Sequence, residues 1–322
     1  SLCSYPGYAK KTLKLVDEKT VASLLFGDRK KHQNRFEASD ITYLKGFFYV
    51  VFDNLMSIGR FEETLATASA KSNKLIGLPK EDSGFEAITF GEGNEQRLYV
   101  VKENVQFSDT EYRPIILEYA ISPAGDLRQT RSCYVDAHSK YENKGLEGVQ
   151  HITRMESGEE KHYLLGLCEG NFCKGGKQGR EVGNGWIVIM YRKQHTYQNM
   201  SCSWIFNPEP LRIPATAAFL DYSAIHIDPE TLKVAITSQE SSALWVGELS
   251  KTEWKFKDEG KVYHFPRMPG SCAKVYCNVE GVQWIDENTV SAVSDKMKGK
   301  GKQDAACLWK DQSIHIFQIP PQ

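Results

Sequence analysis

The sequence has no apolar run long enough to cross a membrane and almost no net charge. Its longest apolar stretches, such as residues 46–52, have the length of a β-strand, whereas a membrane-spanning helix needs about 20 apolar residues. The 40 lysines and arginines are balanced by 41 acidic residues, so the net charge is −1. Proteins that bind nucleic acids are usually basic. The composition therefore argues against both a membrane span and a nucleic-acid partner.

The CxxC spacing of structural zinc sites is also absent, which leaves disulfides or buried free thiols as the roles of the eight cysteines. An even count fits disulfides in a secreted protein, and Asn199-Met200-Ser201 is an acceptor for glycosylation. We therefore expect a secreted, extracellular glycoprotein. The expected pairs, among other pairings that the sequence leaves open, are Cys168–Cys173, Cys272–Cys277, Cys3–Cys307 and Cys133–Cys202.

Long amphipathic helices are missing as well, and residues 61–70 are the only short helical candidate. Five times the chain repeats a serine or glutamate, an alternating strand, a turn, a second strand and an acid. The first positions of these repeats, called the axial residues below, are Ser39, Glu86, Glu147, Ser223 and Glu280. They are separated by 47, 61, 76 and 57 residues. Repeats of about 40–60 residues with four strands each are typical of β-propellers.

These repeats predict an all-β protein that consists of one five-bladed β-propeller domain over residues 1–322. Residues 1–38 are expected to be a lead-in strand and loop, with an outer strand at residues 12–16 beside the last repeat. The blades are expected at about residues 39–79, 80–140, 141–216, 217–273 and 274–322. Six blades are the alternative, if residues 1–38 contain a degenerate blade.

In a propeller the first strand of each blade lines the central channel, so the axial residues should form a ring. A second ring should contain the acids that end the second strands, Asp53, Glu103, Glu169, Glu240 and Asp295. Eight carboxylates in a narrow channel repel one another strongly. Calcium accepts six to eight oxygens, so we expect one Ca²⁺ held by the five axial residues; magnesium suits such a wide cage less well. Alternatively, these acids end strands and pair with lysines, and Ser39 and Ser223 are ordinary strand residues.

Basic loops are expected on the same face as the acids, at residues 29–35 and, rich in glycine, at residues 174–180 and 296–302. The candidate substrate-binding residues are Arg35, Lys102, Arg113, Lys177 and Arg180. An acidic floor with a basic rim suits a site in which a cation assists the reaction of an anionic substrate. Glu169 or Asp53 would act as the general base. The alternative is that these loops are solvated turns. No triad-like arrangement is recognisable among the eight histidines.

The order Ser, Glu, Glu, Ser, Glu resembles the calcium-activated nucleotidases, the soluble apyrases also found in blood-feeding insects. The local matches are residues 36–41 with 48–53, residues 222–227, and residues 280–282. The resemblance implies a five-bladed propeller with one axial calcium held by the axial residues, and hydrolysis of nucleoside di- and triphosphates. The chain departs from that family in lacking an acidic Asp-Leu-Asp segment before the first repeat. It also has residues 100–105 in place of a Gly-Gly and Lys-Glu-Trp stretch.

Three functions agree with these observations. The first is a secreted calcium-dependent hydrolase that acts on a nucleotide-like substrate bearing phosphate. The second is a carbohydrate-active propeller, a lyase or lectin for acidic polysaccharide, and the third is a non-catalytic extracellular binding protein with structural calcium. The expected partner is accordingly an anionic small molecule or an acidic glycan, and the sequence indicates no oligomeric state.

Overall fold

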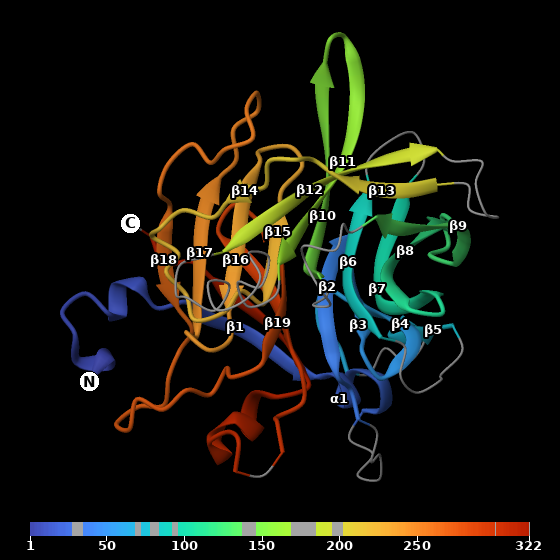
Figure 1. Ribbon diagram of the computed structural model, residues 1–322. Helices are drawn as coiled ribbons and strands as arrows, with labels where there is room; N and C mark the ends of the chain where they lie inside the picture. Colours follow the sequence, from blue (N-terminus) through green and yellow to red (C-terminus); the bar gives the residue numbers. More distant parts are fainter. Residues whose placement is uncertain are drawn as a thin grey trace.

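The computed structural model describes residues 1–27, 35–67, 72–77, 84–91, 96–136, 146–168, 185–194, 202–299 and 301–321, without the side chains of residues 103, 104, 107, 111 and 194. Nearly all of its regular structure is β (Figure 1), so the predicted all-β class is confirmed. The helical candidate at residues 61–70 is wrong for its described part, because residues 61 and 62 end a strand and residues 63–67 contain turns but no helix. No helix among the described residues is long and apolar enough to cross a membrane.

Two sheets contain four antiparallel strands in chain order. The first consists of β2 (Ala38–Leu44), β3 (Phe47–Phe52), β4 (Leu55–Glu62) and β5 (Lys74–Ile76). The second consists of β15 (Ala224–Ile227), β16 (Lys233–Ser238), β17 (Ala243–Glu248) and β18 (Lys261–His264). Between β2 and β3 the chain turns at Lys45 and Gly46, both with positive φ (47° and 86°). Such two-residue turns match the twist of the flanking strands, which fixes their register.

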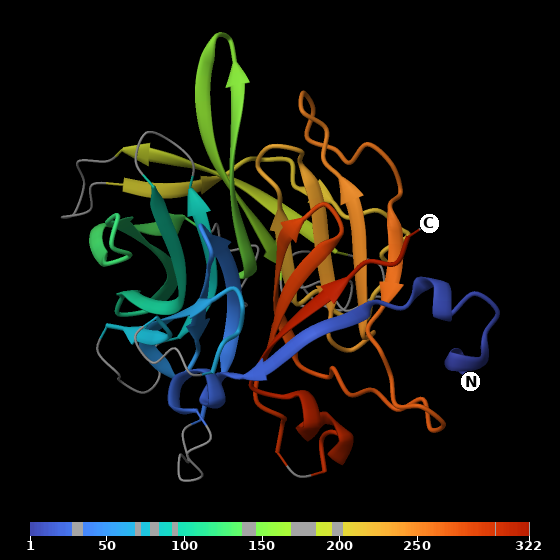
Figure 2. The same cartoon turned by 180° about the vertical axis from the view of Figure 1, so that it is seen from behind.

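A third four-stranded sheet joins the two ends of the chain. It consists of β19 (Val279–Asp286), β20 (Thr289–Ser294), β21 (Ser313–Gln318) and β1 (Lys14–Thr20). β1 pairs antiparallel with β21, so the N-terminal strand lies beside the last repeat, near the position expected at residues 12–16. Figure 2 shows β1, in blue, alongside the red C-terminal strands. A short helix, α1 (Val21–Phe26), follows β1 and is capped by the Thr20 side chain.

The fourth sheet is larger and nearly closes on itself. Its first half consists of β6 (Phe85–Gly91), β7 (Arg97–Ser108), β8 (Glu111–Ile121) and β9 (Leu127–Asp136). Its second half consists of β10 (Leu146–Glu156), β11 (Glu159–Cys168), β12 (Trp186–Gln194), β13 (Cys202–Phe206) and the two-residue β14 (Leu211–Arg212). The outer strands β9 and β13 pair in parallel, and the Cys133–Cys202 disulfide links them. The inner strands β6 and β10 lie in contact.

The first strands of the five repeats, β2, β6, β10, β15 and β19, contact one another in a closed cycle. A side chain bridges each neighbouring pair. The bridges are Ile88 N–H to Asp40 Oδ2 (2.9 Å), His151 N–H to Thr89 Oγ1 (3.3 Å), Ile227 N–H to Gln150 Oε1 (3.1 Å), Trp284 N–H to His226 Nδ1 (3.0 Å) and Thr42 Oγ1–H to Gln283 Oε1 (2.9 Å). The sheets therefore stand around a common axis lined by these strands, which is a propeller-like arrangement.

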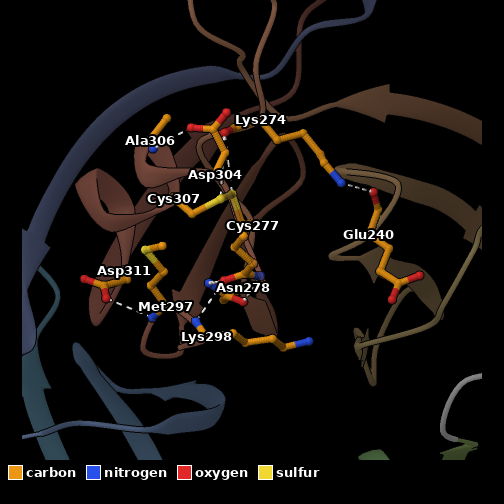
Figure 3. Close-up of a disulfide and its surroundings, with 11 residues drawn as sticks. Glu240, Lys274, Cys277, Asn278, Met297, Lys298, Asp304, Ala306, Cys307 and Asp311 are labelled. Carbon is orange, nitrogen blue, oxygen red and sulfur yellow. Dashed lines mark hydrogen bonds between the residues drawn. A yellow bond between two sulfur atoms is a disulfide. The ribbon is translucent and has the colours of Figure 1, made fainter. Parts of the chain in front are cut away.

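The structure corrects part of the expected disulfide pattern. The Cys133–Cys202 pair is confirmed, whereas Cys3–Cys307 and Cys272–Cys277 are wrong: the pairs are Cys3–Cys272 and Cys277–Cys307. The reason is that Cys307 lies on a 3-10 helix, η6 (Ala305–Lys310), which folds over the start of β19 near Cys277 (Figure 3). Cys168 is disulfide-bonded, but Cys173, its expected partner, lies outside the described residues, as does the acceptor at Asn199.

Candidate site at the acid end of the axis

Four of the five axial residues occupy the same local structure, a β-bulge near the start of a first strand. In β2, β6, β10 and β19 the pairing register shifts across a single residue, which is Ser39, Glu86, Glu147 and Glu280 in turn. Ser223 directly precedes β15, and its N–H bonds to the carbonyl of Thr237 (2.9 Å). In a β-bulge the extra residue breaks the alternation of the strand, so its side chain points in a different direction from those of its neighbours. The sequence repeat thus corresponds to a repeated backbone feature, and we call this end of the axis the acid end.

Glu280 shows how strongly the carboxylates at this end interact. Desolvation by burial is the main cause that raises the pKa of Glu280 well above its usual range, and the charges of Glu147, Asp295 and Asp221 raise it further. Lys298 opposes this shift. Glu147 belongs to β10, Asp221 precedes β15, and Asp295 directly follows β20. Acids from three sheets therefore lie near one another at this end of the axis.

The sheet of β2–β5 contributes Glu37 and Asp53, whose charges act on Asp295. Burial is the main cause that raises the pKa of Asp295 to about 7, and the charges of Glu37 and Asp53 add to it. A hydrogen bond from the Lys296 N–H and the charge of Lys298 act in the opposite direction. Asp53, a predicted general base, has an exposed side chain, and its N–H bonds to the Glu37 carbonyl (2.8 Å). Asp53 is therefore at the acid end; Glu169, the other predicted base, lies outside the described residues.

The segment after β20 provides a cation at this end (Figure 3). Lys298 N–H donates to Gln303 Oε1 (2.9 Å), and the Gln303 side chain bonds to Asn278, just before β19. These bonds and the Cys277–Cys307 disulfide hold the segment against the start of β19. Lys298 lies in a loop that the sequence analysis assigned to the basic rim, but it was not among the predicted substrate-binding residues. Asp221 and Glu37 were missed because neither occupies the repeated positions.

The predicted substrate-binding residues are not gathered in one place. They are Arg35, Lys102, Arg113, Lys177 and Arg180, of which Lys177 and Arg180 lie outside the described residues. Arg35 Nε is 3.6 Å from Glu37 Oε2, so Arg35 lies at the acid end. Lys102 is half-buried and pairs with Phe85, the residue before Glu86. Arg113 forms an ion pair with Asp136 (3.2 Å), which gives its guanidinium a structural partner.

The acid end suits a hard cation in its charge and in its oxygen donors. Within the described residues, however, no three His, Cys, Asp or Glu side chains lie close enough together to hold a metal ion. The Ser223 hydroxyl is 3.0 Å from Thr237 Oγ1 and also bonds to the Thr237 carbonyl. The oxygen donors therefore fit calcium chemically, but among the described residues the carboxylates are not close enough together to coordinate one ion.

The opposite end of the axis opens into a cavity of about 410 Å³. Five polar side chains, each three residues after an axial residue, line it: Thr42, Thr89, Gln150, His226 and Gln283. All five side chains are buried. They take part in four of the five hydrogen-bonded bridges between first strands, and Asp40 makes the fifth. This ring was not predicted from the sequence, although its constant offset from the axial residues is visible there.

A hydrogen-bonded Ser–His–Glu chain is present that the sequence analysis did not recognise. Ser294 Oγ lies 2.7 Å from His315 Nε2, and His315 Nδ1 lies 2.6 Å from Glu18 Oε1. Ser294 and His315 are 1% and 0% exposed. A catalytic nucleophile must reach its substrate, so this chain is structural and joins β1 to the sheet of β19–β21.

No protein-family model matches the chain, and no curated protein matches it in sequence. Three solved structures resemble it in shape. Glutaminyl cyclase from Myxococcus xanthus matches 96% of this chain and 97% of its own at 9% identity, with a TM-score of 0.46. A protein of unknown function from Dyadobacter fermentans matches 98% and 100% at 9% identity, with a TM-score of 0.40. AztD from Citrobacter koseri matches 80% and 65% at 10% identity, with a TM-score of 0.34. Likenesses this weak support no conclusion about function.

Proposed function

We propose that the protein is a secreted, calcium-dependent hydrolase that acts on phosphate-bearing, nucleotide-like substrates at the acid end of a five-bladed propeller. The observation that carries this proposal is the β-bulge shared by Ser39, Glu86, Glu147 and Glu280. The closed cycle of five first strands supports the blade count. In that fold, β6–β9 and β10–β13 are two blades joined at their outer strands. Three disulfides among the described residues support an extracellular location.

The residues at the acid end divide into three roles. Glu86, Glu147 and Glu280, with the hydroxyls of Ser39 and Ser223, would hold the cation. A bound Ca²⁺ supplies positive charge that polarises a phosphoryl oxygen. Asp53, which is exposed beside Asp295, accepts a proton from the attacking water, and Glu169 is the second candidate for this role. Lys298 and Arg35 bind phosphate oxygens, with the remaining predicted rim residues around them.

The proposal is tested by measuring phosphate release from ATP and ADP with calcium and with excess EGTA. We expect release with calcium and none with EGTA. Glu147→Gln and Glu280→Gln should each weaken calcium binding at least tenfold, because each removes one charged oxygen ligand. Glu287→Gln is the matched control, since Glu287 is an exposed acid in the turn between β19 and β20.

Three outcomes would contradict the proposal. Release that persists in EGTA would show that calcium is not needed for hydrolysis. Equal calcium affinity in Glu280→Gln and Glu287→Gln would remove the axial residues from the cation site. A calcium-dependent rise in melting temperature without any phosphate release would favour the non-catalytic function instead.

A further inference from the structure

A second cavity, of about 720 Å³, lies between the two halves of the large sheet. It is distant from the acid end, because Arg97 in its lining pairs with Gly91 at the far end of β6. The described lining is rich in cations and aromatic rings, and we call this cavity the arginine pocket. Its cations are Arg97, Arg131, Arg192 and Lys161, and its aromatic residues are Tyr99, Tyr163, Tyr191 and Trp204, beside His162.

The described lining carries four cationic side chains and one acid, Glu118; Glu156, just outside the lining, pairs with Lys161 (3.6 Å). Glu118 is 8% exposed and lies 3.3 Å from Arg192 Nη1 and 3.8 Å from Arg97 Nε. One carboxylate therefore orients two guanidinium groups and neutralises one charge. Among the residues that the structure describes, Arg131 Nη1 is buried and has no hydrogen-bond partner. A buried donor without a partner is costly, so an acceptor brought by a ligand would bind there favourably.

The charges of all three arginines act on the hydroxyl of Tyr99, another residue of the pocket lining. Burial is the main cause that raises the pKa of Tyr99 to about 12; Glu118 adds to it, and Arg192, Arg97 and Arg131 all lower it. The Tyr99 ring is held in place by stacking on His151, with ring centroids 5.5 Å apart, and by the edge of Trp204 at 6.1 Å. A fixed aromatic wall thus stands beside the guanidinium groups.

We propose that the arginine pocket binds a small organic anion, in which a ring carries a carboxylate or phosphate group. Arginine presents a planar fork of donors that matches either group, and tyrosine and tryptophan provide apolar surface for the ring. A volume of about 720 Å³ lies in the range of small-molecule sites. None of the described lining residues belongs to the acid end, so this binding does not depend on calcium.

Isothermal titration calorimetry in buffer with EGTA tests the site. The ring-bearing anions are adenosine monophosphate and glucuronic acid, and the partial probes are adenosine, which lacks the charge, and inorganic phosphate, which lacks the ring. At least one ring-bearing anion should bind tenfold more tightly than both partial probes. Preference for adenosine monophosphate identifies phosphate as the bound group, and preference for glucuronic acid identifies carboxylate. No binding of either anion at millimolar concentration would overturn the proposal.

Substitutions locate the binding. Arg131→Gln should weaken binding of the preferred anion at least tenfold, and Arg192→Lys, which keeps the charge but loses the fork, several-fold. Lys193→Gln is the matched control, since Lys193 is an exposed neighbour on β12 outside the described lining. Glu280→Gln should also leave this affinity unchanged, which separates the site from the proposed calcium site. If Arg131→Gln and Arg192→Lys both bind as tightly as the parent protein while melting at its temperature, the ligand is bound elsewhere and the proposal is wrong.

Discussion

Position 226 carries a histidine where two of the other first strands carry glutamine. His226 Nδ1 accepts the Trp284 N–H (3.0 Å), as Gln150 Oε1 accepts the Ile227 N–H (3.1 Å). Burial lowers the pKa of His226 to about 3, and only the charge of Asp228 opposes that shift. The folded protein thus holds this ring neutral under conditions in which the unfolded chain would protonate it. The bridge between β15 and β19 is therefore sensitive to acid, whereas its glutamine counterpart is not.

His226→Gln should make the protein less sensitive to acid. Because the pKa of His226 is lower in the folded state than the usual 6.5, the unfolded state binds the extra proton as pH falls below 6.5, and stability is lost. Between pH 7 and pH 5 this loss is about 2 kcal/mol for one such histidine. Urea unfolding at both pH values should show that the variant loses about 2 kcal/mol less than the parent protein. His151, whose pKa burial also lowers to about 3, keeps its own contribution in both proteins. Identical pH dependence would mean that His226 is protonated in the folded state.

Two glycines that follow an axial glutamate lie where the first strands approach one another closely. A Cβ atom on Gly281 of β19 would lie 2.8 Å from Ile41 N and 2.9 Å from Asp40 Cα, both backbone atoms of β2. A Cβ atom on Gly148 of β10 would lie 2.7 Å from the Ile225 side chain of β15. Backbone does not move aside as easily as the end of a flexible side chain. Glycine at position 281 therefore sets how close β19 and β2 can be.

Gly281→Ala should destabilise the protein by about 1–3 kcal/mol, since the added methyl group forces two packed strands apart. The measurement is the free energy of unfolding in urea. Gly299→Ala is the control, because Gly299 has open space around it and should change stability by less than about 0.5 kcal/mol. Equal stability of the two variants would show that the strands shift at no cost.

Local patterns predicted the repeated hairpins well, because each alternating strand and its turn are written in consecutive residues. The position of the N-terminal strand beside the last repeat also followed from its short apolar pattern. Contacts between distant loops were not predictable in this way: Cys3 pairs with Cys272, 269 residues away, and only the folded loops determine that choice. The arginine pocket was missed for the same reason, since Arg97, Arg131 and Arg192 lie on three different strands. No local signal marks residues that only the pairing of β9 with β13 brings together.

At the scale of the whole molecule, the ends of the chain meet in the sheet formed by β19, β20, β21 and β1. Glu18 of β1 is the central contact of this sheet. Its carboxylate pairs with His315 of β21 and Lys310 of η6 and accepts a hydrogen bond from the hydroxyl of Tyr276. These partners lie 258–297 residues away in the sequence. Burial tends to raise the pKa of Glu18, but the bonds and charges of His315 and Lys310 outweigh it and lower the pKa to about 2.

Glu18→Gln should therefore weaken the closure of the molecule. Its pKa in the folded state lies below the usual 4.5, so this carboxylate stabilises the fold above pH 4.5, and the stabilisation is lost as pH falls toward 2. Urea unfolding at pH 7 should show a loss of about 2–3 kcal/mol for the variant, and the difference from the parent protein should shrink by roughly half at pH 3. Asp17→Asn is the control, because Asp17 pairs with Lys19 at the surface (3.1 Å), where such pairs contribute less than about 1 kcal/mol. If Glu18→Gln costs no more than Asp17→Asn, the closure depends on backbone pairing between β1 and β21 and not on this half-buried carboxylate.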